Sequence, residues 1–113
     1  MARKVIEFNL EYNHPTVETA VQKLKNALTT FKGQGYKAVI VIHGYGSSGV
    51  GGSIKTAVTK CLAESSMRGI VRASAGGEQW SARKKEIVSF CKDLENHELR
   101  VANNPGVTIV ILR

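Results

Sequence analysis

The first hydrophobic pattern in the chain has the two-residue period of a half-buried strand. Between Lys4 and Glu11, the apolar residues Ile6, Phe8 and Leu10 alternate with polar neighbours. A break rich in turn-forming residues follows, and it ends at Thr16, a residue type that caps helices. The pattern therefore predicts a strand over Lys4–Glu11 and a helix directly after Thr16.

A period near 3.6 residues then marks three amphipathic helices. The first follows Thr16 and is expected to end at glycines 33 and 35. The second is expected to begin with Ser53 as its cap, and the third to cover residues 80–94. The apolar stripes of the first two helices hold Val17, Ala20, Val21, Leu24, Leu28 and Phe31, and then Ile54, Ala57, Val58, Cys61 and Leu62.

Three further strands complete the pattern. Residues 36–43 read Y-K-A-V-I-V-I-H, a run typical of a central strand that is covered on both faces or flanked by parallel neighbours. A shorter strand is expected over residues 67–73, and the run V-T-I-V-I-L forms a last strand over residues 107–112. The order β-α-β-α-β-α-β predicts a layered α/β domain with a mostly parallel sheet.

Length and composition narrow the class of protein. A chain of 113 residues and 12.3 kDa has room for one domain. Its 42% hydrophobic and 22% charged residues are typical of a globular protein and argue against disorder. No apolar run approaches the roughly 20 residues that span a bilayer, and no apolar segment of a secretory signal follows the first residues. A cytoplasmic location is therefore expected.

The charge is strongly positive. The chain has 16 Lys and Arg residues against nine Asp and Glu, a net charge of +7 with a pI near 9.7. Such a balance indicates a protein that meets phosphate groups, as nucleic-acid-binding proteins do. A basic protein without a polyanionic partner is the alternative that net charge alone leaves open.

The two cysteines, Cys61 and Cys91, lie far apart and have no C-x-x-C partner. This spacing excludes a zinc site built on paired thiolates. Both fall on apolar faces of predicted helices, which favours a role as small buried residues. A Cys61 nucleophile with a distant histidine is the alternative.

The strongest candidate for chemistry is a glycine-rich loop that runs from a strand into a helix. It reads I-V-I-H-G-Y-G-S-S-G-V-G-G-S-I-K over residues 40–55. Glycines let the backbone approach a ligand, and the helix N-terminus offers N–H donors and the positive end of the helix dipole, which suits a phosphate. A tyrosine inside the loop can stack on bases. The candidate binding residues are Gly44, Tyr45, Gly46, Ser47, Ser48, Gly49, Gly51, Gly52, Ser53 and the cation Lys55.

Two common phosphate loops do not fit this segment. In the Walker pattern, Val50 stands where the lysine is needed and Gly51 where the magnesium-binding hydroxyl is needed. The dinucleotide pattern G-x-G-x-x-G is present, but it follows the second strand, and the next strand ends without an acidic residue. An NTPase and a Rossmann site are therefore both disfavoured. A connection that binds nothing is the remaining alternative.

The loop and three flanking features resemble the Smr (small MutS-related) domain family. The segments I-H-G-Y-G and S-I-K-x-x-V are similar to that family's I-H-G-x-G element and the L-[KR]-x-x-V start of its next helix. Residues 16–20, T-V-E-T-A, resemble the family's T-V-x-E-A, and P-G-V-T-I-V-I-L resembles its final strand. The resemblance covers about residues 6–73 and resumes at Pro105.

Two departures from the family pattern stand out. The family's first strand usually ends in L-D-L-H-G, and this chain has no such motif. Alignment without a gap matches it to residues 10–14, which keeps the acid as Glu11, and alignment by the strand matches it to residues 8–12. We prefer the first register because it needs no insertion, and both lose the family histidine. Residues 74–104, with the basic run at 83–85, look like a helical insertion.

The resemblance implies a single Smr-like domain over residues 1–113, with the fold of a two-layer sandwich. Its four-stranded, mixed, mostly parallel sheet would be similar to that in the C-terminal domain of the third bacterial translation initiation factor. It also implies binding to DNA or RNA, with weak endonuclease or nicking activity in some members.

The residues here are compatible with phosphodiester cleavage. His43 would act as general base or acid, and Glu11 or His14 would orient it or position water. One carboxylate is too few for a two-metal site, so no obligatory metal or other cofactor is expected. A non-catalytic nucleic-acid-binding module and a protein-interaction module are the alternatives.

Overall fold

The computed structural model describes residues 4–10, 16–44 and 50–113. It consists of four strands with helices between them, and three short 3-10 turns. The elements in chain order are β1 (Val5–Asn9), α1 (Val17–Gly33), β2 (Ala38–Ile42), α2 (Val50–Leu62), η1 (Ser65–Met67), β3 (Val71–Gly76), η2 (Gly77–Gln79), α3 (Trp80–Phe90), η3 (Lys92–His97), α4 (Glu98–Val101) and β4 (Val107–Leu112).

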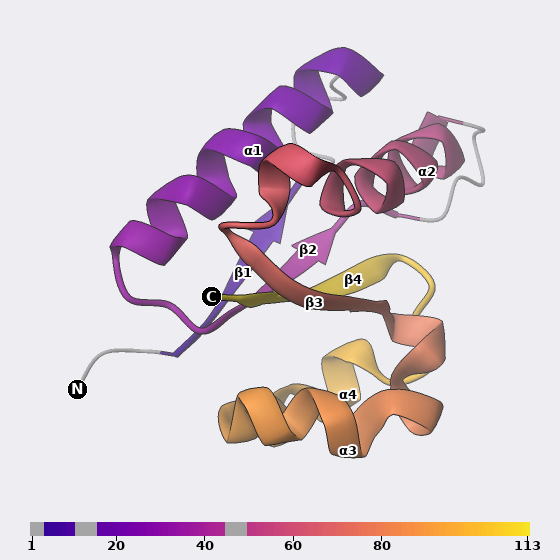
Figure 1. The fold of residues 1–113 in the computed structure, drawn as a ribbon. Coiled ribbons are helices and arrows are strands. Elements are labelled where there is room, and N and C mark those ends of the chain that lie inside the picture. The colour runs from indigo at the N-terminus through magenta and orange to yellow at the C-terminus, as the bar shows by residue number, and fades with distance from the viewer. Residues whose placement is uncertain (1–3, 11–15, 45–49) are drawn as a thin grey trace.

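The strands form one mixed sheet in the order β1-β2-β4-β3. β1 pairs with β2 in parallel, whereas β4 is antiparallel to both of its neighbours, β2 and β3. The expectation of a mostly parallel sheet is therefore wrong for the pairings. β1, β2 and β3 do point the same way, as the alternation with helices requires, but β4 inserts between β2 and β3 and runs against them (Figure 1).

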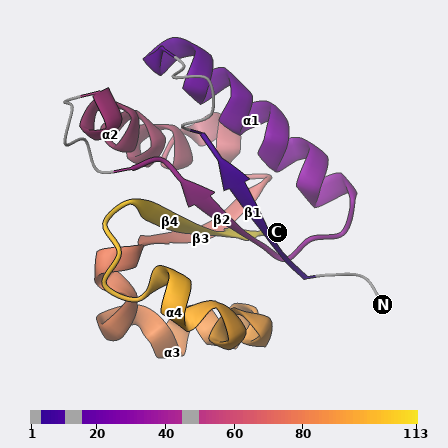
Figure 2. The same ribbon diagram turned by 180° about the vertical axis from the view of Figure 1, so that it is seen from behind.

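Helices cover both faces of this sheet, so the domain has three layers and the expectation of a two-layer sandwich is wrong (Figures 1 and 2). We call α1 and α2 the front layer, and η2, α3, η3 and α4 the rear layer. The cause lies in the central strands: Val39 and Val41 of β2 face the front core, and Ala38 and Ile40 face the rear core. A strand that is apolar on both sides needs cover on both.

The front layer follows the sequence closely. α1 begins after Thr16, whose hydroxyl accepts a hydrogen bond from the Thr19 backbone N–H at 3.1 Å, as predicted for a capping threonine. Its apolar stripe puts Leu24 and Leu28 into the core with no exposed surface. Phe31 packs edge-on against Phe8 of β1, with ring centroids 5.8 Å apart.

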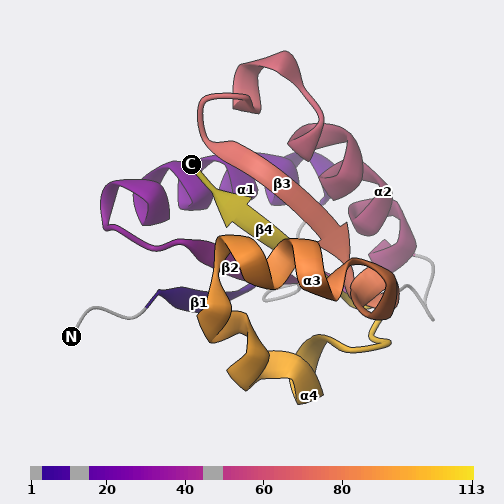
Figure 3. The same cartoon turned by 60° about the horizontal axis from the view of Figure 1, so that its bottom comes forward.

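The rear layer is built from shorter pieces (Figure 3). α3 ends at Phe90, four residues before the predicted end, and the chain continues as the 3-10 turn η3 and the single-turn helix α4. Trp80 is 1% exposed, and its indole Nε1 donates to the Glu98 carboxylate at 2.7 Å. Leu94 and Val101, from η3 and α4, are fully buried beside it.

Two boundaries differ from the sequence prediction. α2 begins at Val50 rather than after Ser53, so Ser53 lies inside the helix and is not its N-cap. β3 covers Val71–Gly76 rather than residues 67–73, because Met67 lies in the 3-10 turn η1, where it is buried in the front core. Among the described residues, no helix is long and apolar enough to cross a membrane.

Candidate functional site

Four strand ends meet at one edge of the sheet. Asn9 at the end of β1 pairs with Ile42 at the end of β2, and Ile42 pairs with Val107 at the start of β4. Thr108, the next residue of β4, pairs with Gly76 at the end of β3. The predicted glycine-rich segment leaves β2 at this edge, so the candidate site lies where connections between strands and helices converge.

Gly44 begins the loop in a backbone conformation that favours glycine. Its φ is +72°, in the left-handed region where a side chain is strained. The backbone N–H groups of His43 and Gly44 both donate to the Gly106 carbonyl at 3.0 Å. These bonds tie the end of β2 to the turn that precedes β4 and fix the direction in which the loop departs.

His43, the residue before Gly44, is fully buried. Its ring Nδ1 lies 2.6 Å from the Gly44 carbonyl oxygen, and its Nε2 lies 2.8 Å from the Thr108 hydroxyl. Because a carbonyl only accepts, Nδ1 carries the proton, and in the neutral ring Nε2 accepts from Thr108. The Thr108 hydroxyl therefore connects the buried His43 ring with the cavity that Thr108 lines.

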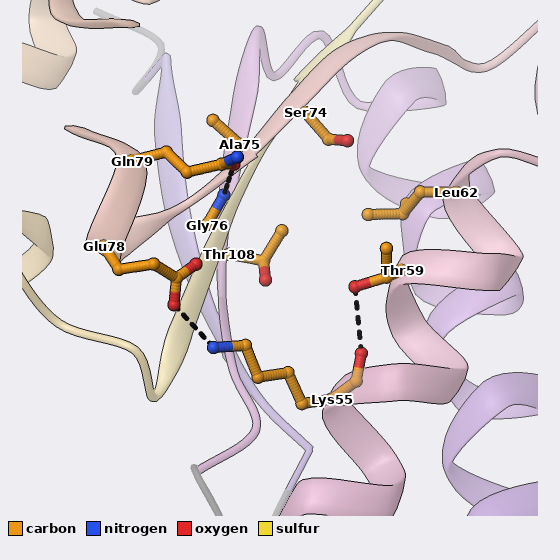
Figure 4. Close-up of a pocket in the computed structure, with 9 residues that line it drawn as sticks. All are labelled: Lys55, Thr59, Leu62, Ser74, Ala75, Gly76, Glu78, Gln79 and Thr108. Atoms are coloured by element: carbon orange, nitrogen blue, oxygen red, sulfur yellow. Dashed lines mark hydrogen bonds and ion pairs between the residues drawn. The ribbon is translucent and has the colours of Figure 1, made fainter. Parts of the chain in front are cut away.

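A cavity of about 300 Å³ opens beside Thr108, between α2 and the end of β3 (Figure 4). Figure 4 shows Thr108 in the middle of the lining, with α2 on one side and η2 on the other. Six of the nine lining residues carry a hydroxyl, amide or charged group. The lining residues are Lys55, Thr59, Leu62, Ser74, Ala75, Gly76, Glu78, Gln79 and Thr108.

The predicted cation of the site, Lys55, lies on the wall of this cavity and already has a partner. Its ammonium group is 2.5 Å from Oε2 of Glu78, which extends from η2 on the opposite wall. Lys55 therefore lies on α2, which follows the glycine-rich segment in sequence, and it contacts a carboxylate from residues 74–104.

The remaining predicted residues divide into two groups. Gly51 and Gly52 lie in the first turn of α2, where an α-helix leaves its N–H groups without partners inside the helix. Tyr45, Gly46, Ser47, Ser48 and Gly49 fall outside the described residues, as do Glu11 and His14. The structure thus brings Gly44, His43 and Lys55 to one region, and it adds residues that sequence reasoning missed.

Those missed residues are Thr108, Thr59, Glu78 and Gln79. Thr108 sits in a run of apolar strand residues, V-T-I-V-I-L, where a single hydroxyl is the available signal of a polar contact. Glu78 reaches Lys55 across 23 positions of sequence, and Thr108 reaches His43 across 65. Separations of this size leave no local pattern from which the contact could be predicted.

The other candidate chemistries find little support in the described part of the chain. Cys61 and Cys91 are both buried, and burial raises the pKa of each thiol. A raised thiol pKa disfavours a thiolate nucleophile at Cys61 and agrees with the predicted packing role. Among the described residues, no three His, Cys, Asp or Glu side chains are grouped so that they could hold a metal ion.

The fold and this sheet edge define an α/β domain with a cavity that is lined by Lys55 of α2, by Thr108 of β4 and by Glu78 of η2. The sequence profile of the Smr domain matches residues 13–113. The chain therefore belongs to the Smr domain family, as the I-H-G-Y-G segment and the final strand predicted.

A solved structure shows the same fold. The Smr domain of Thermus thermophilus MutS2 aligns with a TM-score of 0.58 at 19% identity, over 97% of this chain and 98% of that one. No curated protein matches the chain. Nothing in these comparisons tests whether residues 74–104 are an insertion, and that assignment stays a prediction, as does the likeness to the translation factor domain.

Proposed function

We propose that this domain binds DNA or RNA through the sheet edge formed by the glycine-rich loop, the start of α2 and the cavity. The observation that carries the proposal is Lys55, a cation beside hydroxyl groups and next to the loop of an Smr domain. A net charge of +7 supports it, because a polyanion is then attracted over the whole surface.

In this proposal the backbone phosphate is the group that the protein recognises. Lys55 supplies the positive charge, and the N–H groups of Gly51 and Gly52, in the first turn of α2, would donate to the phosphate oxygens. The loop backbone would come close to the nucleic-acid strand, because it contains the glycines Gly44, Gly46 and Gly49. Further hydroxyl groups would come from Ser47, Ser48 and Ser53. Tyr45 would stack on a base.

Phosphodiester cleavage is the finer part of the proposal. His43 would act as a base through Thr108: its Nε2 takes the Thr108 proton, and the Thr108 oxygen takes one from the attacking hydroxyl or water. The attacking oxygen would bond to phosphorus as the bond from phosphorus to the leaving oxygen breaks, and the leaving oxygen would take a proton from water. Glu11 would orient the nucleophile. The loop amides and Lys55 would stabilise the charge on the phosphate oxygens. No metal ion is invoked.

Binding without cleavage is the second candidate function. The observation that favours it is the burial of His43, whose two ring nitrogens are both hydrogen bonded within the protein. In this alternative His43 fixes the loop, and the domain holds nucleic acid for a partner. A protein-interaction role without nucleic acid is the third candidate. The binding experiment described next would identify it by the absence of binding to both DNA and RNA.

The first test measures binding to a 20-nucleotide single strand, as DNA and as RNA, over a series of salt concentrations. We expect affinity to fall steeply with salt, and Lys55→Gln to weaken binding and reduce the salt slope by about one. Lys60→Gln is the matched control, because Lys60 is an exposed cation of the same helix. Salt-independent binding, or equal effects of the two substitutions, would contradict the proposal.

The second test separates cleavage from binding. Purified protein is incubated with nicked and branched DNA and with structured RNA, and the products are resolved on denaturing gels. We expect His43→Ala and Thr108→Val both to abolish any cleavage, since each breaks the same chain of proton transfer. Circular dichroism checks that the variants are folded. Cleavage that survives in folded His43→Ala rules out the catalytic role of His43.

A further inference from the structure

A carboxylate of the protein itself, that of Glu78, already lies beside Lys55 at the cavity. The Glu78 carboxylate extends from η2 across the opening, and its Oε2 meets the Lys55 ammonium group at 2.5 Å (Figure 4). The two side chains keep 29% and 41% of their surface exposed. The carboxylate therefore occupies the position beside Lys55 that a ligand anion would take.

The backbone below Glu78 leaves space for this carboxylate. At Gly76, an added Cβ would lie 1.7 Å from Oε1 of Glu78, so the missing side chain leaves the space in which the carboxylate lies. The Gly76 N–H also donates to the Gln79 side-chain oxygen at 3.0 Å. The end of β3 and the turn after it are thus built around Glu78.

The next glycine anchors that turn to the rear layer. A Cβ at Gly77 would lie 2.1 Å from the carbonyl oxygen of Asn104 and 2.5 Å from that of Val101. The Gly77 carbonyl also accepts from the Asn103 N–H at 3.1 Å. Because backbone atoms surround Gly77 and hydrogen bond to it, the backbone before Glu78 is fixed, and moving the carboxylate away from Lys55 requires only rotation of the Glu78 side chain.

The rest of the lining places further polar groups beside Lys55. Ser74 contributes a hydroxyl, and Gln79 contributes an amide whose oxygen already accepts a hydrogen bond. The hydroxyl protons of Thr59 and Thr108 are already used, by the Lys55 carbonyl oxygen and by Nε2 of His43.

The volume of about 300 Å³ is the space that remains with the Glu78 carboxylate in place. A cation with a hydroxyl and an amide beside it is the chemistry of a phosphate site.

We propose that this cavity is a subsite for a backbone phosphate of the nucleic acid, and that the Glu78 carboxylate occupies the position of this phosphate in the free protein. The proposal rests on the proposed function and adds a residue from outside the glycine-rich loop. When the phosphate arrives, it displaces Glu78 from Lys55, and the side chain turns to solvent. Glu78 then lowers affinity, because each binding event breaks its ion pair and brings two anions together.

The size of the effect follows from the exposure of the pair. Partly exposed ion pairs contribute little, so their loss changes an equilibrium by about two- to fivefold. Glu78→Gln keeps the shape of the side chain and removes its charge. We therefore expect this variant to bind about two- to fivefold more tightly than the natural sequence.

The experiment measures fluorescence anisotropy of labelled 20-nucleotide DNA and RNA strands with four variants: Glu78→Gln, Glu64→Gln, Lys55→Gln, and Lys55→Gln with Glu78→Gln. Glu64 is the matched control, because it also pairs with a lysine, Lys25 at 3.0 Å, and its loss changes the net charge equally. We expect Glu78→Gln to raise the affinity for nucleic acid more than Glu64→Gln does. This increase in affinity should largely disappear when Glu78→Gln is combined with Lys55→Gln.

Each outcome decides the proposal. Equal gains at the two glutamates, or an undiminished gain without Lys55, would show that Glu78 acts only through net charge and would overturn the subsite while the proposed function stands. If the natural protein and every variant fail to bind either strand, the proposed function falls, and the subsite falls with it.

Discussion

The front and rear layers cover the same sheet in different ways. The front layer consists of two long helices, α1 and α2, whose aliphatic side chains fill the core. The rear layer consists of an 11-residue helix, two 3-10 turns and a four-residue helix, joined by polar contacts. The difference teaches that a regular apolar stripe is one way to cover a sheet, and a large buried side chain with well-placed hydrogen bonds is another.

The polar contacts of the rear layer are concentrated around Glu98. Its carboxylate accepts from the Trp80 indole at 2.7 Å and pairs with the Lys84 ammonium group at 2.8 Å. Arg83 adds a hydrogen bond to the Ser74 carbonyl and a two-point ion pair with Glu86. The positive charge of the basic run 83–85 is therefore partly neutralised by Glu86 and Glu98.

The two layers also meet at the candidate site. The front layer supplies Lys55 and Thr59, whereas the turn that opens the rear layer supplies Glu78 and Gln79. The cavity exists because β3 is an edge strand, around which the rear layer can reach to the front face. A change in the rear layer can therefore alter a site that the front layer carries.

The largest expected effect tests whether the two layers form one cooperative unit. Trp80→Ala removes a side chain that is 1% exposed and should cost about 3–5 kcal/mol of unfolding free energy, and Leu24→Ala in the front core should cost about 2–5 kcal/mol. Both cores share β2 and β4, so we expect a single unfolding transition for each variant. Urea denaturation followed by circular dichroism measures the transition. Tryptophan fluorescence is unsuitable, because Trp80 is the one tryptophan of the chain and Trp80→Ala removes it.

A partial unfolding would break this comparison. If Trp80→Ala melts the rear layer alone, the urea m-value falls or a second transition appears, while Leu24→Ala keeps the m-value of the natural protein. Trp80→Phe is the control, because it keeps an aromatic ring and loses the hydrogen bond to Glu98. Two separate transitions would show that the rear layer is an addition to an independently stable front.

The same contrast explains how much of the fold could be predicted. The helix that begins after Thr16 and its apolar stripe with Leu24 could be predicted from the sequence, because capping and a period of 3.6 residues are local signals. The rear segments η3 and α4 are too short to show a period, and the Trp80–Glu98 bond joins residues 18 apart. The position of β4 depends on pairing with distant strands, and periodicity carries no information about it.

The candidate site divides in a similar way. Motif reasoning placed Lys55 and His43 at the sheet edge, because a strand, a glycine-rich loop and a helix are contiguous in sequence. It missed the rear-layer contribution of Glu78, and it placed the start of α2 four residues late, at Ile54 after a Ser53 cap rather than at Val50. Glycines 51 and 52 looked like loop residues, since glycine is a poor helix former, but they lie in the first turn of α2.

The smallest expected effect compares the acid sensitivity of the two layers. The hydrogen bonds from Lys84 and then Trp80 lower the pKa of Glu98, and those from Lys25 and then Ser66 lower the pKa of Glu64. A carboxyl whose pKa is lower in the folded state stabilises the fold above its unfolded pKa, near 4.5, and this contribution disappears as pH falls through the folded value.

Glu98→Gln should therefore lower the melting temperature by about 1–3 °C at pH 7, and this effect should shrink as pH falls below 4.5 and through the lowered pKa of Glu98. Glu64→Gln should follow the same course with a smaller shift, because Glu64 lies on the surface and holds no buried aromatic residue. Thermal melts at pH 7 and pH 3 measure the two shifts. A Glu98→Gln effect that stays constant from pH 7 to pH 3 would mean that the charge of Glu98 is unimportant and that its shape alone supports Trp80.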